Sequence, residues 1–117
     1  MKTNVIVNLA VDGLHSWPDA RKVFPEVGFL ADVHRHMFHV KLSYRVSHND
    51  RDREFILFKR DVLDYIHLKY YRQEYNCHFF GAMSCEMIAE ELLEYFDCDW
   101  VEVFEDGENG ARVEIDR

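Results

Sequence analysis

A long segment of alternating residue types, residues 33–47, constrains the fold of this chain most strongly. Its even positions from Phe38 to Val46 are apolar, whereas its odd positions from His39 to Arg45 are polar. A period of two is typical of a β-strand with one buried face. His34 and His36 share the parity of Phe38, so the segment should carry both imidazoles on its buried face.

The rest of the chain divides into short strands and two amphipathic helices. Expected elements are strands at 4–11, 33–47, 100–105 and 111–115, helices at 54–71 and 84–96, a long loop at 14–32 and an irregular stretch at 70–83. Asp12 and Gly13 are expected to end the first strand, and Ser84 to cap the second helix. Residues 106–110 are expected to form a hairpin turn, for which Asn109-Gly110 is a strong local signal. The order ββααββ predicts one α+β domain over residues 1–117, a four-stranded antiparallel sheet with two helices on one face.

Charge and cysteine content restrict the classes of partner and compartment. The formal net charge is −8, which argues against nucleic acids and anionic membranes as partners. Cys77, Cys85 and Cys98 are odd in number and lack a CxxC spacing, so we expect free thiols in a cytoplasmic protein. Exposed edges of so small a sheet need pairing, so we also expect a homo-oligomer.

Three histidines form the candidate metal site. His34 and His36 lie two residues apart on one strand face, and His15 is a plausible third ligand 19 residues upstream of His34. Three histidines with one open position are typical of a catalytic zinc site. The alternative is that these are ordinary strand histidines satisfied by their neighbours. If zinc binds, the carboxylate of Asp12 or Asp32 could fix an imidazole tautomer from behind.

Three motifs resemble those of the 6-pyruvoyl-tetrahydropterin synthase and 6-carboxytetrahydropterin synthase family. Residues 34–38, His-Arg-His-Met-Phe, resemble the family's His-Gly-His motif, which an aromatic residue follows. Residues 83–86, Met-Ser-Cys-Glu, resemble its Pro-Thr-x-Glu helix start, and residues 101–105, Val-Glu-Val-Phe-Glu, its Val-x-Val-aromatic-Glu strand. Together the motifs extend the resemblance over nearly the whole chain.

The resemblance implies a fold, a cofactor and a ligand. The family has the tunnelling fold (T-fold), in which ββααββ units assemble into barrels as trimers, tetramers or hexamers. It implies zinc on His15, His34 and His36, and lyase-type chemistry on a pterin or purine-like small molecule. In the family the glutamate corresponding to Glu105 anchors the amino-pyrimidine edge of the pterin. Three further residues would frame the heterocycle: Ser84, Cys85 and Glu86.

The catalytic base is the open point of this resemblance. The family's catalytic cysteine has no counterpart in residues 27–32, and its Asp-His pair has none in residues 69–75. Cys85, at a helix N-terminus, and His78 are the candidate catalytic residues, with His67 a weaker one. The alternative is that each is a structural residue, with Cys85 simply replacing the family's threonine. A non-catalytic protein that binds or sequesters a pterin or purine nucleotide is therefore the alternative function, and an oligomer with vestigial pockets is a third.

Overall fold

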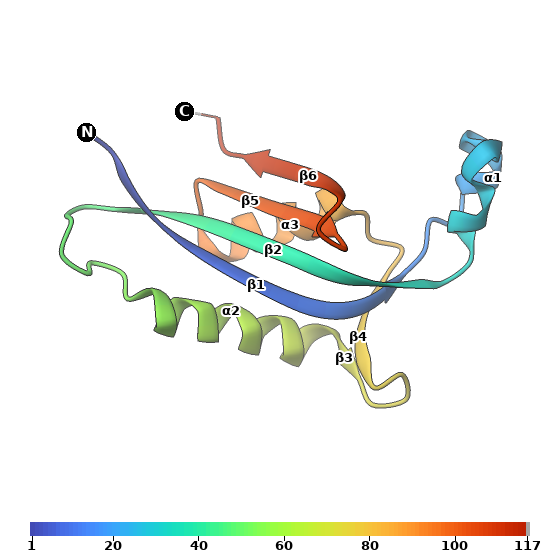
Figure 1. Ribbon diagram of the computed structural model, residues 1–117, viewed down its shortest axis with the longest axis horizontal. Helices are drawn as coiled ribbons and strands as arrows, with labels where there is room; N and C mark the ends of the chain where they lie inside the picture. Colours follow the sequence, from blue (N-terminus) through green and yellow to red (C-terminus); the bar gives the residue numbers. More distant parts are fainter. Residues whose placement is uncertain (117) are drawn as a thin grey trace.

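The computed structural model describes residues 1–116 as one layer of strands with helices on one side (Figure 1). The elements are β1 (Thr3–His15), α1 (Ala20–Val23), the 3-10 helix η1 (Pro25–Ala31), β2 (His34–Val46), α2 (Phe55–Tyr70), β3 (Tyr71–Arg72), β4 (Cys77–Gly81), α3 (Cys85–Phe96), β5 (Trp100–Glu105) and β6 (Asn109–Glu114). Among the described residues, no helix is long and apolar enough to cross a membrane.

The sheet has six strands in the order β3-β4-β1-β2-β5-β6. β1 pairs with β4 in parallel, and the other neighbouring pairs are antiparallel. The predicted four-stranded antiparallel sheet with two helices, and the T-fold that the resemblance implied, are therefore wrong. The stretch expected to be irregular, residues 70–83, supplies β3 and β4, and the expected loop at residues 14–32 contains α1 and η1.

β1 and β2 form the long central ladder of the sheet. Each strand has 13 residues, and their register runs from Thr3 opposite Val46 to His15 opposite His34. The predicted strand at 33–47 is thus confirmed as β2, whereas the first strand continues four residues beyond its predicted end at residue 11. Gly13 permits this continuation, because a Cβ there would overlap the ring of Phe80.

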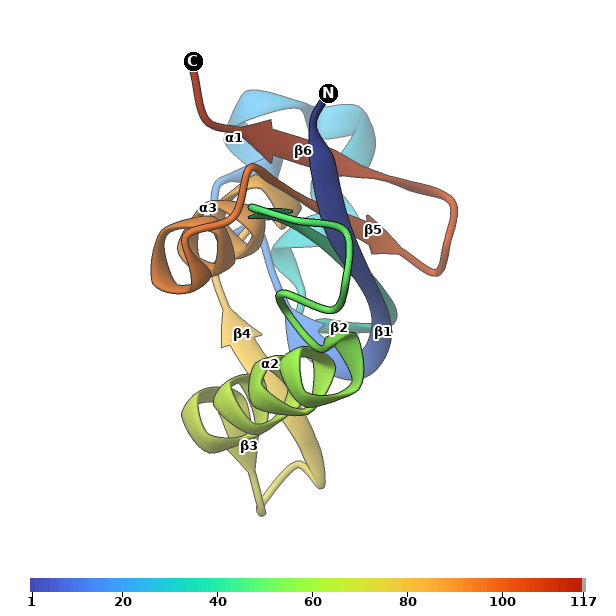
Figure 2. The same cartoon turned by 90° about the vertical axis from the view of Figure 1, so that its left-hand side faces the viewer.

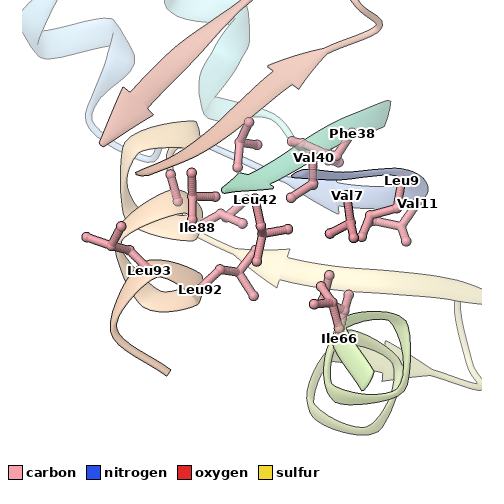
Figure 3. Packing of buried hydrophobic residues seen from close by; sticks show 14 of the residues in the cluster. Val7, Leu9, Val11, Phe38, Val40, Leu42, Ile66, Ile88, Leu92 and Leu93 are labelled. Atoms are coloured by element: carbon pink, nitrogen blue, oxygen red, sulfur yellow. The ribbon is translucent and has the colours of Figure 1, made fainter. Parts of the chain in front are cut away.

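The hydrophobic core lies between the sheet and the two long helices, which cover the same face (Figure 2). α2 packs over β1 and β4, and α3 packs over β5 and β6. Figure 3 shows the side chains that meet there: Val7, Leu9 and Val11 from β1, Phe38, Val40 and Leu42 from β2, Ile66 from α2, and Ile88, Leu92 and Leu93 from α3. Phe38, at the histidine end of β2, is fully buried. The core therefore extends up to the candidate site.

Side chains cap the start of both long helices. The carboxylate of Glu54 accepts hydrogen bonds from the backbone N–H groups of Ile56 and Leu57, at 3.0 and 2.9 Å. Ser84 was predicted to cap the second helix, and its Oγ accepts the N–H of Met87 at 3.1 Å. Each cap satisfies donors that lack a partner in the first helical turn. The Ser84 cap also fixes where α3 begins beside the histidines.

Candidate metal centre and its pocket

The three predicted metal ligands meet at one end of the central ladder. His15 is the last residue of β1, and His34 and His36 are the first and third residues of β2. Their rings are 4.5 to 5.4 Å apart, centroid to centroid. One nitrogen from each ring lies within 4.8 Å of the other two, so the cluster could hold a metal ion. The shared parity of His34 and His36, together with the pairing of His15 with His34, produces this arrangement.

Hydrogen bonds behind the rings fix the orientation of each imidazole. Nδ1 of His15 lies 2.9 Å from the carbonyl oxygen of Met83, and Nδ1 of His34 lies 2.8 Å from that of Asp32. Nδ1 of His36 lies 2.7 Å from a carboxylate oxygen of Asp106. These oxygens can only accept, so Nδ1 must carry the proton in each ring. In the neutral form, every Nε2 therefore presents a lone pair.

Within the part of the chain that the structure describes, two of the three Nε2 atoms have no hydrogen-bond donor near them. Nε2 of His15 and of His36 are buried without a hydrogen-bond partner. The carboxylate of Glu105 lies 3.0 Å from the first and 3.6 Å from the second. Burial lowers the pKa of His15, against the opposing effects of the Met83 carbonyl and Glu105, so this ring favours the neutral form. Lone pairs and a carboxylate then face one another with no proton between them. A divalent cation fits this donor set.

Asp106 supplies the carboxylate behind the site that the sequence had suggested for Asp12 or Asp32. One of its oxygens accepts from His36, and the other accepts the backbone N–H of Met37 at 2.9 Å. The Met37 hydrogen bond, more than the His36 bond, holds the pKa of Asp106 below its usual value. The carboxylate of Asp12 instead pairs with Arg35 at 2.7 Å. Asp32 does contact His34, but only through its backbone carbonyl.

The sequence signal for Asp106 is the Asp106-Gly107 pair directly after the predicted strand at 100–105, and the register of that strand gives its position. β2 and β5 pair with Phe38 opposite Glu105, so the residue after Glu105 must lie beside residues 36 and 37. The backbone of Asp106 has a φ of 56°, a left-handed conformation in which aspartate and asparagine are enriched. An Asp-Gly pair directly after a paired strand therefore places this carboxylate at the histidines.

A cavity of about 380 Å³ opens beside the histidines. Its lining combines the start of α3, the end of β1 with the segment after it, and the adjoining ends of β5 and β6: His15, Ser16, Trp17, Leu30, His34, Ala82, Met83, Ser84, Cys85, Glu86, Met87, Glu105, Asn109 and Gly110. All four predicted ligand-binding residues are in this set. The volume falls within the range of small-molecule sites. A larger hollow of about 440 Å³ lies at the other end of β2, around Tyr44 and Arg53, far from this chemistry.

Cys85 lies in the cavity as a protonated thiol. Burial is the largest cause that raises its pKa to about 12, followed by the negative charges of Glu105 and Glu86 and a hydrogen bond to Glu105. A helix N-terminus usually lowers a thiol pKa, but here burial and the two carboxylates outweigh it. At neutral pH the thiol is thus a donor to Glu105 and a poor nucleophile.

His78, the other candidate base, lies outside the cavity. Its Nδ1 is 2.9 Å from the backbone carbonyl oxygen of Asp12, and its side chain is buried. Its ring lies 5.6 Å from that of His67 and 5.8 Å from that of Tyr71. This group forms where β3 and β4 meet the end of α2. It is not among the residues that line the pocket.

Comparisons with known proteins support the fold alone. No family model matches the chain, and no curated protein matches it. A crystal structure of an uncharacterized protein from Wolinella succinogenes has a similar fold, with a TM-score of 0.67 over 99% of both chains. Its sequence is 14% identical, so the similarity concerns the arrangement of helices and strands. Function must therefore be argued from the site.

Proposed function

We propose that this protein is a zinc-dependent enzyme acting on a pterin or a related purine-like small molecule. The observation that carries the metal is the convergence of His15, His34 and His36, each with its proton held on Nδ1 by an acceptor behind the ring. Three neutral imidazoles are the protein ligands of many catalytic zinc ions. Bound zinc would supply a Lewis acid that polarises an oxygen of the ligand.

The ligand class follows from Glu105 and the cavity. A carboxylate can accept two parallel N–H bonds from a guanidine-like edge, such as the amino-pyrimidine edge of a pterin or guanine. Glu105 lines the cavity beside the histidines, and its side chain is 31% exposed, so a ligand can reach it. Trp17 and Leu30 in the same lining offer apolar surface to a flat heterocycle.

The resemblance to 6-pyruvoyl-tetrahydropterin and 6-carboxytetrahydropterin synthases supports lyase-type chemistry. It rests on the three motifs, and it assigns His15, His34 and His36 to zinc, Glu105 to the heterocycle, and Ser84, Cys85 and Glu86 to its surroundings. In this proposal the buried free thiols Cys77, Cys85 and Cys98 belong to a cytoplasmic protein, and the active form is a homo-oligomer.

A non-catalytic binder is the second candidate, and one observation favours it. Proton transfer needs a group of suitable pKa within reach of the ligand. The Cys85 thiol has a pKa of about 12, and His78 is bound to a backbone carbonyl outside the cavity. A pocket that keeps its anchor and its metal ligands, but in which neither candidate base can act, would sequester a heterocycle without converting it.

Binding and turnover measured on the same preparation separate the two functions. The zinc-loaded protein should bind neopterin in calorimetry, and Glu105→Gln should weaken that binding. Glu102→Gln is the matched control, because Glu102 lies on the other face of β5 and pairs with Arg112 at 2.9 Å. Conversion of dihydroneopterin triphosphate would establish the enzyme, whereas binding without conversion would favour the sequestering protein. If the zinc-loaded wild type bound neither neopterin nor dihydroneopterin triphosphate, the proposed ligand class would be refuted.

A further inference from the structure

We propose that Glu105 is the fourth ligand of the metal when the pocket holds no small molecule. This inference rests on the proposed metal site and deepens it. Glu105, the proposed anchor for the heterocycle, would then occupy the fourth coordination position of the metal in the ligand-free protein. An open coordination position would arise only when an incoming ligand draws the carboxylate away.

The spacing between Glu105 and two of the three histidines, His15 and His36, is close to that of ligands sharing one ion. Two atoms bound at about 2.0–2.1 Å to a tetrahedral zinc lie roughly 3.3 Å from each other. Oε2 of Glu105 lies 3.0 Å from Nε2 of His15, and Oε1 lies 3.6 Å from Nε2 of His36. These distances bracket the expected spacing.

The backbone brings Glu105 to this position. Glu105 is the last residue of β5 and pairs with Phe38 across the β2–β5 ladder. It shares strand parity with the buried residues Val101 and Val103, so its side chain projects onto the face that carries the histidines. A ligand carried by a paired strand is held more closely than one on a free loop.

The charges around the carboxylate also favour a metal. The ion pairs of Glu105 within residues 1–116 are with His15 and His36 alone, and no lysine or arginine pairs with it. The Cys85 thiol donates one hydrogen bond to the carboxylate. The remaining lone pairs of Glu105 and those of the imidazoles are satisfied together by one cation.

Cobalt substitution tests this ligand without any assay of activity. Co²⁺ affinity is measured by competition with a chelator, and azide is titrated while the visible spectrum of the bound Co²⁺ is followed. We compare the wild type with Glu105→Gln, which removes the charge, and Glu105→Asp, which keeps the charge but shortens its reach. Glu86→Gln removes a charge from the same cavity and is the matched control. Circular dichroism establishes that each variant is folded.

Both Glu105 variants should bind Co²⁺ at least about tenfold more weakly, the lower limit for loss of even an outer-shell partner. Both should also take up azide at concentrations that leave the spectrum of the wild type and of Glu86→Gln unchanged. Equal affinity and equal azide response in all four proteins would overturn the proposal while leaving the histidine site intact. The proposal would also be overturned if Glu105→Asp behaved as the wild type while Glu105→Gln did not. That result would indicate that Glu105 acts only through its charge. Failure of the wild type to bind Co²⁺ would refute the metal site itself.

Discussion

Nδ1 of His36 lies 2.7 Å from Oδ2 of Asp106, and the other oxygen of that carboxylate accepts the N–H of Met37 at 2.9 Å. The two hydrogen bonds fix the carboxylate against the backbone of the strand that carries the histidine. Asp106 thereby holds the His36 ring in the tautomer whose Nε2 faces His15 and His34. Such outer partners position a metal ligand and raise its basicity.

Asp106→Asn should therefore weaken zinc binding by about 10–100-fold, the range found for outer-shell partners. Asparagine tolerates the left-handed backbone at this position, but its amide has only one acceptor oxygen for the two N–H groups of His36 and Met37. Chelator competition gives the zinc affinity. Glu108→Gln removes a charge from the same turn and should bind zinc as the wild type does. Equal affinity in the wild type and Asp106→Asn would contradict the positioning role.

Cys85 should resist alkylation in the wild type and react faster in Glu105→Gln. The pKa of the thiol is about 12, so its thiolate fraction is small near neutral pH. Removal of the Glu105 charge and acceptor should lower that pKa, although burial continues to raise it. The measurement is the pH dependence of iodoacetamide labelling, followed by mass spectrometry of the peptide containing Cys85. A thiol that is rapidly labelled at neutral pH in the wild type would instead favour a nucleophile.

Gly13→Ala should destabilise the protein by about 1–3 kcal/mol, the usual cost of overpacking a core. An added Cβ would overlap the Phe80 ring and lie 3.1 Å from the Phe38 ring. Replacing a strand glycine by alanine would otherwise gain about 0.5–1 kcal/mol from the unfolded chain, which the overlap should exceed. Urea unfolding measures the change. Phe80→Leu in the same chain should relieve part of the loss, and strictly additive effects would argue against the contact.

Glu54 should stabilise the protein in a manner that depends on pH. Hydrogen bonds from Ile56 and Leu57 lower its pKa below the ordinary value of 4.5. A carboxyl group whose pKa is lowered by folding stabilises the native state at pH values above its unfolded pKa. This stabilisation is lost as the pH falls through the folded pKa. Glu54→Ala should thus be less stable than the wild type near neutral pH, with a difference that shrinks below pH 4.5. A difference that stays constant with pH would contradict the cap as its source.

The strongly periodic elements of the fold could be predicted from the sequence, whereas the short ones could not. Alternation over 13 residues identifies β2, and both long helices have a clear apolar stripe. β3 has two residues and β4 has five, and Cys77–Gly81 lacks alternation. The parallel pairing of β4 with β1 is a contact between distant segments that no local pattern encodes. The apparent stop at Asp12 and Gly13 was misleading, because Asp12 pairs with Arg35 and Gly13 receives Phe80.

In the site, strand parity predicted the shared face of His34 and His36, whereas His15 was a plausible third ligand and Glu105 was assigned from the resemblance. His15, His34 and His36 cluster, and Glu105 joins them, because neighbouring strands carry them in register. The chemistry of Cys85 and the position of His78 were harder to predict. The pKa of Cys85 depends on how deeply its surroundings are buried, and the position of His78 depends on the unforeseen strand β4. Those properties emerge only from tertiary packing.

The zinc content of the protein tests the central claim most directly. Native mass spectrometry of protein purified without chelators should give one zinc ion per chain, and His34→Ala should lose it. His39→Ala, a histidine of the same strand with opposite parity, should keep it. Metal-free wild type that takes up no added zinc, or zinc retained in His34→Ala as firmly as in the wild type, would contradict the three-histidine centre.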